Sequence, residues 1–75
     1  MTRMPQVTAR DLVRFLKSQG FEEERQAGSH LTLWHPGRRI AVTVPVHTGV
    51  DLGLGLAVRI LKDAGFSVDD FIGLR

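Results

Sequence analysis

One stretch of this 75-residue chain decides its fold: Gln26-Ala27-Gly28-Ser29-His30-Leu31-Thr32-Leu33-Trp34-His35-Pro36. Gly28 and Ser29 predict a turn, and apolar and polar side chains alternate after it, as they do in a half-buried strand. His30 stands where the turn becomes the strand. A histidine at such a place is held by the strand yet open to solvent, so its imidazole can titrate near neutral pH and reach a ligand.

Two further strands flank this one in the sequence. A turn at Pro36-Gly37-Arg38-Arg39 precedes a row of β-branched residues with a period of two, which predicts a strand with one buried face. The row consists of Ile40, Val42, Val44 and Val46. On the N-terminal side, the polar run from Phe21 to Gln26 favours a short edge strand that begins with one buried phenylalanine. The three strands predict an antiparallel sheet.

The alternation divides the side chains of this sheet between two faces. If Leu31 and Leu33 share the core with the β-branched row, the polar side chains of the same strand lie on the open face. That face would carry His30, Thr32 and Trp34, beside Ala41, Thr43 and Arg39. An exposed tryptophan in this position suggests stacking with a nucleobase or an arginine, or docking of a protein partner.

Helices are predicted before and after the strands. Thr8 and Asp11 have the spacing of a capping box, and the helix that follows can end at Gly20. Its buried face would be formed by Ala9, Leu12, Val13 and Leu16.

A glycine-rich connection, 47–55, leads to a second helix. That helix would bury Leu56, Ala57, Ile60, Leu61 and Ala64. The segment 67–70 repeats the capping pattern for a short final helix. The order α-β-β-β-α-α predicts one α+β domain over residues 1–75.

The composition limits the kinds of site that the chain can hold. It contains no cysteine, so disulfides and thiolate metal sites are excluded. No apolar run has the length of a signal peptide or a membrane span, and we expect a soluble, cytoplasmic protein. The net charge of +2 is mildly basic. No acidic residue occurs from Arg25 to Val50, which fits either an anion-facing surface or the ordinary exclusion of carboxylates from strands.

A stripe of basic residues is predicted on the exposed side of the first helix, at Arg10, Arg14 and Lys17. Such a stripe is usually a solvated helix face. It is also the arrangement that would contact a phosphate backbone. Gly53 and Gly55, before the second helix, could likewise let backbone amides approach a phosphate or could simply form a loop.

The three histidines suggest a zinc site, but their spacing argues against one. His30 and His35 are an odd number of positions apart on one strand, so their side chains leave opposite faces and cannot converge on one ion. A serine triad lacks an acidic residue to orient the imidazole. These residues instead favour one imidazole acting as general base or acid on RNA, because the ribose 2′-hydroxyl already lies beside the phosphodiester that is broken.

Several short segments of the chain, taken together and in this order, are fairly specific to one protein family. They are Gly20-Phe21 at a helix end, Gln26-Ala27-Gly28-Ser29-His30, His35-Pro36 before a Gly-Arg turn, Thr43-Val44-Pro45-Val46-His47, and Ile60-Leu61-Lys62-Asp63-Ala64-Gly65 with the tail from Ser67 to Phe71. In these segments the chain resembles the HicA toxins of bacterial toxin–antitoxin modules, also called YcfA-like mRNA interferases. The resemblance covers nearly the whole chain.

The resemblance implies a fold like that of a double-stranded-RNA-binding domain, with helices on one face of the sheet. It implies a toxin that is an endoribonuclease and cleaves mRNA independently of the ribosome, with His30 as its catalytic histidine. We expect this toxin to act in a stress response and to use neither a metal nor a cofactor. It further implies a cognate HicB-like antitoxin that covers the site. We expect no membrane association and a monomer when the chain is free. The expected RNA-binding residues are Arg10, Arg14, Lys17, Ser29, Trp34 and Arg39.

One departure from the family pattern leaves the function open. After His47 the family often has lysines and a Gly-Thr-Leu helix start, whereas this chain has Val50, Gly53 and Gly55-Leu56-Ala57. Fewer basic contacts to phosphate would weaken RNA binding. A non-catalytic RNA-binding module that uses the basic helix stripe is therefore an alternative, and an interaction protein that uses Trp34 is a third. Whether either of the other two histidines assists the chemistry is open at this point.

Overall fold

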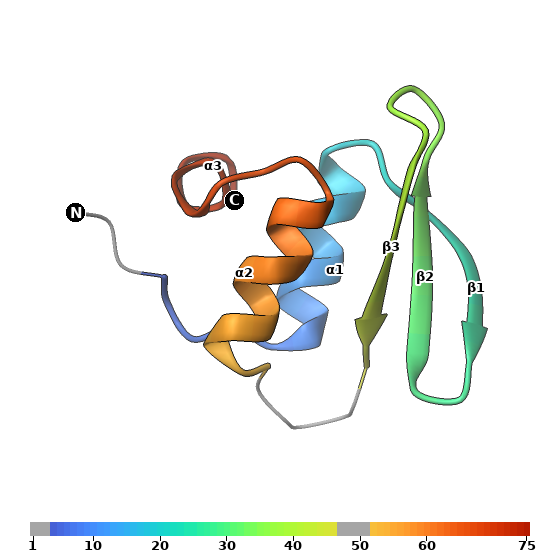
Figure 1. The fold of residues 1–75 in the computed structure, drawn as a ribbon, viewed down its shortest axis with the longest axis horizontal. Helices are drawn as coiled ribbons and strands as arrows, with labels where there is room; N and C mark the ends of the chain where they lie inside the picture. Colours follow the sequence, from blue (N-terminus) through green and yellow to red (C-terminus); the bar gives the residue numbers. More distant parts are fainter. Residues whose placement is uncertain (1–3, 47–51) are drawn as a thin grey trace.

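The computed structural model describes residues 4–46 and 52–75. Its elements, in chain order, are α1 (Ala9–Ser18), β1 (Glu22–Ala27), β2 (His30–His35), β3 (Ile40–Pro45), α2 (Leu54–Asp63) and α3 (Val68–Leu74). The strands form one antiparallel sheet in the order β1-β2-β3, with β2 in the centre. Figure 1 shows α1 and α2 on one side of the sheet and α3 beyond them. The predicted α+β class and element order are confirmed.

The helix ends are fixed by the local sequence, as predicted. The Thr8 hydroxyl accepts a hydrogen bond from the Asp11 N–H at 3.1 Å, and the Asp11 carboxylate accepts one from the Thr8 N–H at 3.2 Å. Ser67 and Asp70 form the same reciprocal pair at the start of α3. After α1, Gly20 takes a φ of +100°, which an L-residue adopts only with strain. These local interactions determine where α1 and α3 begin and where α1 ends.

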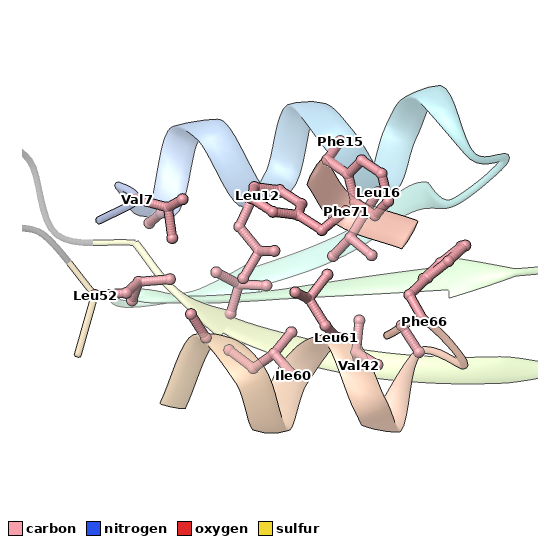
Figure 2. Packing of buried hydrophobic residues seen from close by; sticks show 14 of the residues in the cluster. Val7, Leu12, Phe15, Leu16, Val42, Leu52, Ile60, Leu61, Phe66 and Phe71 are labelled. Atoms are coloured by element: carbon pink, nitrogen blue, oxygen red, sulfur yellow. The ribbon is translucent and has the colours of Figure 1, made fainter. Parts of the chain in front are cut away.

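The core lies between the helices and one face of the sheet (Figure 2). Its fully buried side chains come from every layer and include Val7, Leu12, Leu16, Leu33, Val44, Leu61 and Phe71. Phe15 packs edge-to-face on Phe66 and on Phe71, with ring centroids 5.1 and 5.0 Å apart, and so ties α1 to α3. Because this cluster packs on the apolar face of the sheet, the polar side chains that alternate with it lie on the opposite face.

The second helix begins earlier than the sequence pattern suggested, and one prediction about it was wrong. Leu56 was expected in the core, but its side chain is 43% exposed. The helix starts at Leu54, and its buried stripe runs through Ala57, Ile60 and Leu61. Leu56 lies at the edge of that stripe, in the first turn of the helix and about 100° around the axis from Ala57, so much of its side chain faces solvent.

The edge strand β1 is short, polar and exposed along its whole length, as expected, and Phe21 just before it is buried. It is not regular. Its pairing with β2 shifts between Glu23 and Arg25, which leaves Glu24 as an extra residue. This β-bulge reverses the face on which the side chains after it lie.

Within the described residues, no helix is both long and apolar enough to cross a membrane.

Candidate active site on the open face of the sheet

His30 is the first residue of the central strand, and its side chain is exposed. It pairs with Ala27 on β1 and with Pro45 on β3, so two small or rigid neighbours flank it on the same face. The turn before it has Gly28 at a φ of +60°. The Ser29 carbonyl accepts a hydrogen bond from the Val46 N–H at 2.6 Å, which closes this end of the sheet. The backbone at His30 is therefore fixed while its imidazole stays in solvent.

Two further rows of side chains lie beside His30 on the open face. In the next row Thr32 pairs with Thr43, and their hydroxyl oxygens are 3.4 Å apart. In the row after it, Trp34 lies between Glu22 and Ala41. Trp34 is partly buried rather than fully exposed, and Thr43 is exposed. The prediction that these side chains share the face opposite the core is confirmed by the burial of Leu31 and Leu33 between them.

Arg25 joins this face, and the sequence reasoning missed it. It pairs with Thr32, directly across from it on β1, because the bulge at Glu24 shifts the register. In a regular strand that begins with Glu22 on the open face, alternation would put Arg25 on the helix side. The polar run of β1 contains no periodic signal that marks the bulge. The face that carries His30 thus gains one guanidinium next to the threonine row.

His35 lies on the opposite face and is part of the fold. One of its ring nitrogens, Nδ1, accepts a hydrogen bond from the Arg38 N–H at 3.0 Å, so the other nitrogen, Nε2, carries the proton and donates to the Gln19 carbonyl at 3.1 Å. The ring also packs edge-to-face on Phe21, with centroids 5.1 Å apart. His35 is therefore unsuited to proton transfer on a ligand. Among the side chains of β2, hydrogen bonds within the described residues belong to Thr32 and His35 and leave the His30 ring free.

The two arginines of the β2–β3 turn lie at the far end of β2 from His30. Arg38 places its guanidinium carbon 4.9 Å from the centre of the Phe66 ring, on the helix side. Arg39 is exposed, precedes the β3 ladder, and has a φ of +59°. Its N–H donates to the His35 carbonyl at 2.7 Å, which closes the turn. Of the predicted RNA-binding residues in the hairpins, Ser29 adjoins His30, whereas Arg39 lies a strand length away from it.

The basic stripe of α1 is not on the His30 face. Arg10 and Arg14 are exposed on a helix that packs against the core side of the sheet. Lys17 forms an ion pair with Glu23 of β1 at 2.7 Å, so its charge is partly neutralised. The structure therefore separates the predicted RNA-binding residues into two groups, one on α1 and one on or beside the open face. A single flat ligand surface cannot include both.

A pKa shift accompanies the capping box at the start of α1. The pKa of Asp11 is lowered, mainly by the backbone N–H of Thr8 and then by the Thr8 hydroxyl, with smaller contributions from Arg75 and Arg14. Within residues 4–46 and 52–75, no three histidine or carboxylate side chains gather as metal ligands would. His47 and the connection up to Asp51 lie outside the described residues.

Comparison with protein families identifies the chain. The family model described as the HicA toxin of bacterial toxin–antitoxin systems matches residues 9–66, which include all three strands and the first two helices. A search of curated proteins gave no match. The matched region covers well over half of the 75 residues, and it contains the hairpin that presents His30. The chain belongs to the HicA toxin family of bacterial toxin–antitoxin systems.

Proposed function

We propose that this HicA family member is an endoribonuclease that cleaves mRNA with His30 as its general base and without a metal ion. The observation that carries the proposal is the contrast between the two described histidines. The His35 ring is held at both nitrogens by the fold, whereas the His30 ring is exposed on an open sheet face. A neutral imidazole that is fixed at its backbone and free at its ring can accept a proton from a bound ligand.

The proposed reaction is an internal phosphoryl transfer within the RNA. His30 takes the proton of a ribose 2′-hydroxyl, and that oxygen attacks the adjacent phosphorus. The bond from phosphorus to the 5′-oxygen breaks, and the 5′-oxygen leaves with a proton from water. The products carry a 2′,3′-cyclic phosphate and a 5′-hydroxyl. Proton transfer of this kind contributes roughly 10²–10⁴-fold to a rate.

The proposed partner is a HicB-like antitoxin that covers the open face and so excludes RNA from His30. This proposal follows from the family, whose members are the toxins of toxin–antitoxin pairs. We propose that the toxin acts in the cytoplasm, where its mRNA substrate occurs, and that it is a monomer when the antitoxin is absent. The unpartnered polar face supports this arrangement, since a sheet with one solvated face is stable without a second copy.

The test compares the native chain with His30→Ala on a 5′-labelled structured RNA in EDTA, with the fragment ends analysed. We expect cyclic-phosphate ends from the native chain and a loss of roughly 10²–10⁴-fold in the cleavage rate for His30→Ala. The matched control is His35→Gln, which removes the other described histidine. It should lower the melting temperature but keep cleavage at temperatures where the protein is folded.

Two results would contradict the proposal. Cleavage by His30→Ala at the native rate would remove His30 from the mechanism. If both proteins retard RNA on a gel but leave it intact, the chain is a non-catalytic RNA-binding module. In that case binding should fall steeply with salt and should respond to substitution of Arg10 or Arg14. Circular dichroism of each variant shows whether the fold is retained.

A further inference from the structure

We infer that the bulge in β1 makes Arg25 a substrate-binding residue, so that the open face holds a single RNA strand with a phosphate at Arg25 and an unpaired base stacked on Trp34. This inference rests on the proposed function, because it places substrate beside His30. It concerns residues that neither the histidine chemistry nor the family match requires.

The bulge determines which face Arg25 occupies. Before it, Glu23 pairs with buried Leu33, and its carboxylate bonds to Lys17 on the helix side. After it, Arg25 pairs with Thr32, whose hydroxyl meets that of Thr43 on the open face. Without the extra residue, the guanidinium would lie on the helix side of the edge strand. Bulges that redirect a side chain are common beside active sites.

The three rows on the open face have the spacing of a nucleic-acid strand. His30, Thr32 and Trp34 alternate along β2, so successive rows are about 7 Å apart. This spacing is close to the distance between neighbouring phosphates in an extended strand. If the phosphate that is cleaved lies at His30, the next phosphate comes to the row of Arg25. Arginine binds phosphate through several donors in a fixed fork.

The last row suits a base better than a phosphate. Trp34 lies between the Glu22 carboxylate, which would repel a phosphate, and Ala41, whose methyl group is too small to cover an indole. A planar base can stack on the exposed part of the ring. Inside a duplex both faces of a base are covered by its stacked neighbours, so the geometry favours single-stranded RNA over a duplex.

The chain contains one tryptophan and no tyrosine, so its intrinsic fluorescence reports on Trp34 alone. The probe is a short single-stranded oligoribonucleotide with methyl groups on all 2′-oxygens, which cannot be cleaved. We expect it to quench the fluorescence of the native chain. Arg25→Gln should bind it more weakly, and the slope of log affinity against log salt should fall by about 0.7, the value for one phosphate contact in a single strand.

The matched control is Arg59→Gln, which removes an exposed arginine on α2, the element on the core side of the sheet. It should keep both the native affinity and the native salt slope. Trp34→Ala, followed with a fluorescein-labelled form of the same probe, should bind roughly tenfold to hundredfold more weakly, and Trp34→Phe should recover part of the loss. With a cleavable strand, Arg25→Gln should raise KM more than it lowers kcat.

Three results would overturn the inference. The first is an affinity and salt slope for Arg25→Gln equal to those of Arg59→Gln. The second is quenching by a duplex equal to that by the single strand. The third is a Trp34 signal that responds to the antitoxin and not to RNA, which would make the face a protein interface only. Absence of cleavage by the native chain would contradict the proposed function alone, since binding of the methylated probe requires no chemistry.

Discussion

Replacing Gly20 by alanine tests how α1 is joined to the β2–β3 hairpin. Gly20 has a φ of +100°, and a Cβ placed there would be 2.7 Å from His35 Nε2. That nitrogen donates to the Gln19 carbonyl at 3.1 Å. The added methyl group therefore makes this backbone conformation unfavourable and displaces the imidazole from its partner. Both effects come from one carbon atom.

The expected loss follows from these two effects. A left-handed conformation costs a residue with a Cβ about 1–2 kcal/mol. Loss of the His35–Gln19 hydrogen bond costs about 0.5–1.5 kcal/mol more. We expect Gly20→Ala to lower the free energy of unfolding by roughly 1.5–3.5 kcal/mol, the sum of the two costs. A domain of this size has about 4–11 kcal/mol in total. Because 1 kcal/mol corresponds to about 4–8 °C in a small domain, the melting temperature should fall by roughly 6–28 °C.

Gly28→Ala is the matched control. Gly28 has a φ of +60°, and its added Cβ meets no atom within 4 Å. It should therefore show the backbone cost of about 1–2 kcal/mol and nothing more. Urea unfolding, followed by circular dichroism, measures both variants. In a His35→Ala background, the cost of Gly20→Ala should fall to that of Gly28→Ala. The reasoning is refuted if the two single variants lose equal stability in the native background.

Three other predictions concern the helix cap at Thr8 and Asp11 and the surface ion pair of Lys17. Thr8→Ala removes the hydroxyl that accepts from the Asp11 N–H and should cost about 1 kcal/mol at neutral pH in urea unfolding. Because the pKa of Asp11 is lowered in the folded chain from its ordinary value of 3.8, its carboxylate stabilises the fold above that pH, and this contribution is lost as the pH falls through the lower folded pKa. Unfolding at pH 7 and pH 3 should therefore show a larger effect of Asp11→Asn at pH 7, and an equal effect at both would contradict the assigned cause. Lys17→Gln breaks an exposed ion pair with Glu23 and should change the free energy of unfolding by at most about 1 kcal/mol, and by less at high salt. A larger loss that does not depend on salt would contradict the assignment of this contact as an ordinary surface ion pair.

The sequence by itself determined the elements and the two faces of the sheet. Capping residues such as Thr8 act on amides three residues away, and the alternation around Leu31 and Leu33 follows from the two-residue period of a strand. These signals are local, so the neighbouring residues suffice to predict them. The family resemblance was equally visible in the sequence, and the family match confirms it. Placement of His30 on an open face followed from the same alternation.

The tertiary structure decided which of the candidate residues belong to one surface. The bulge at Glu24 turns Arg25 to the face of His30, because register is set by pairing with β2 and not by β1 itself. The role of His35 depends on the Gln19 carbonyl, 16 positions away in the chain. The basic stripe of α1 was correctly placed on an exposed helix face, but only the packing of that helix shows that it lies away from His30. Local periodicity gives the direction of a side chain within its own element, and the partners across the fold determine what it meets.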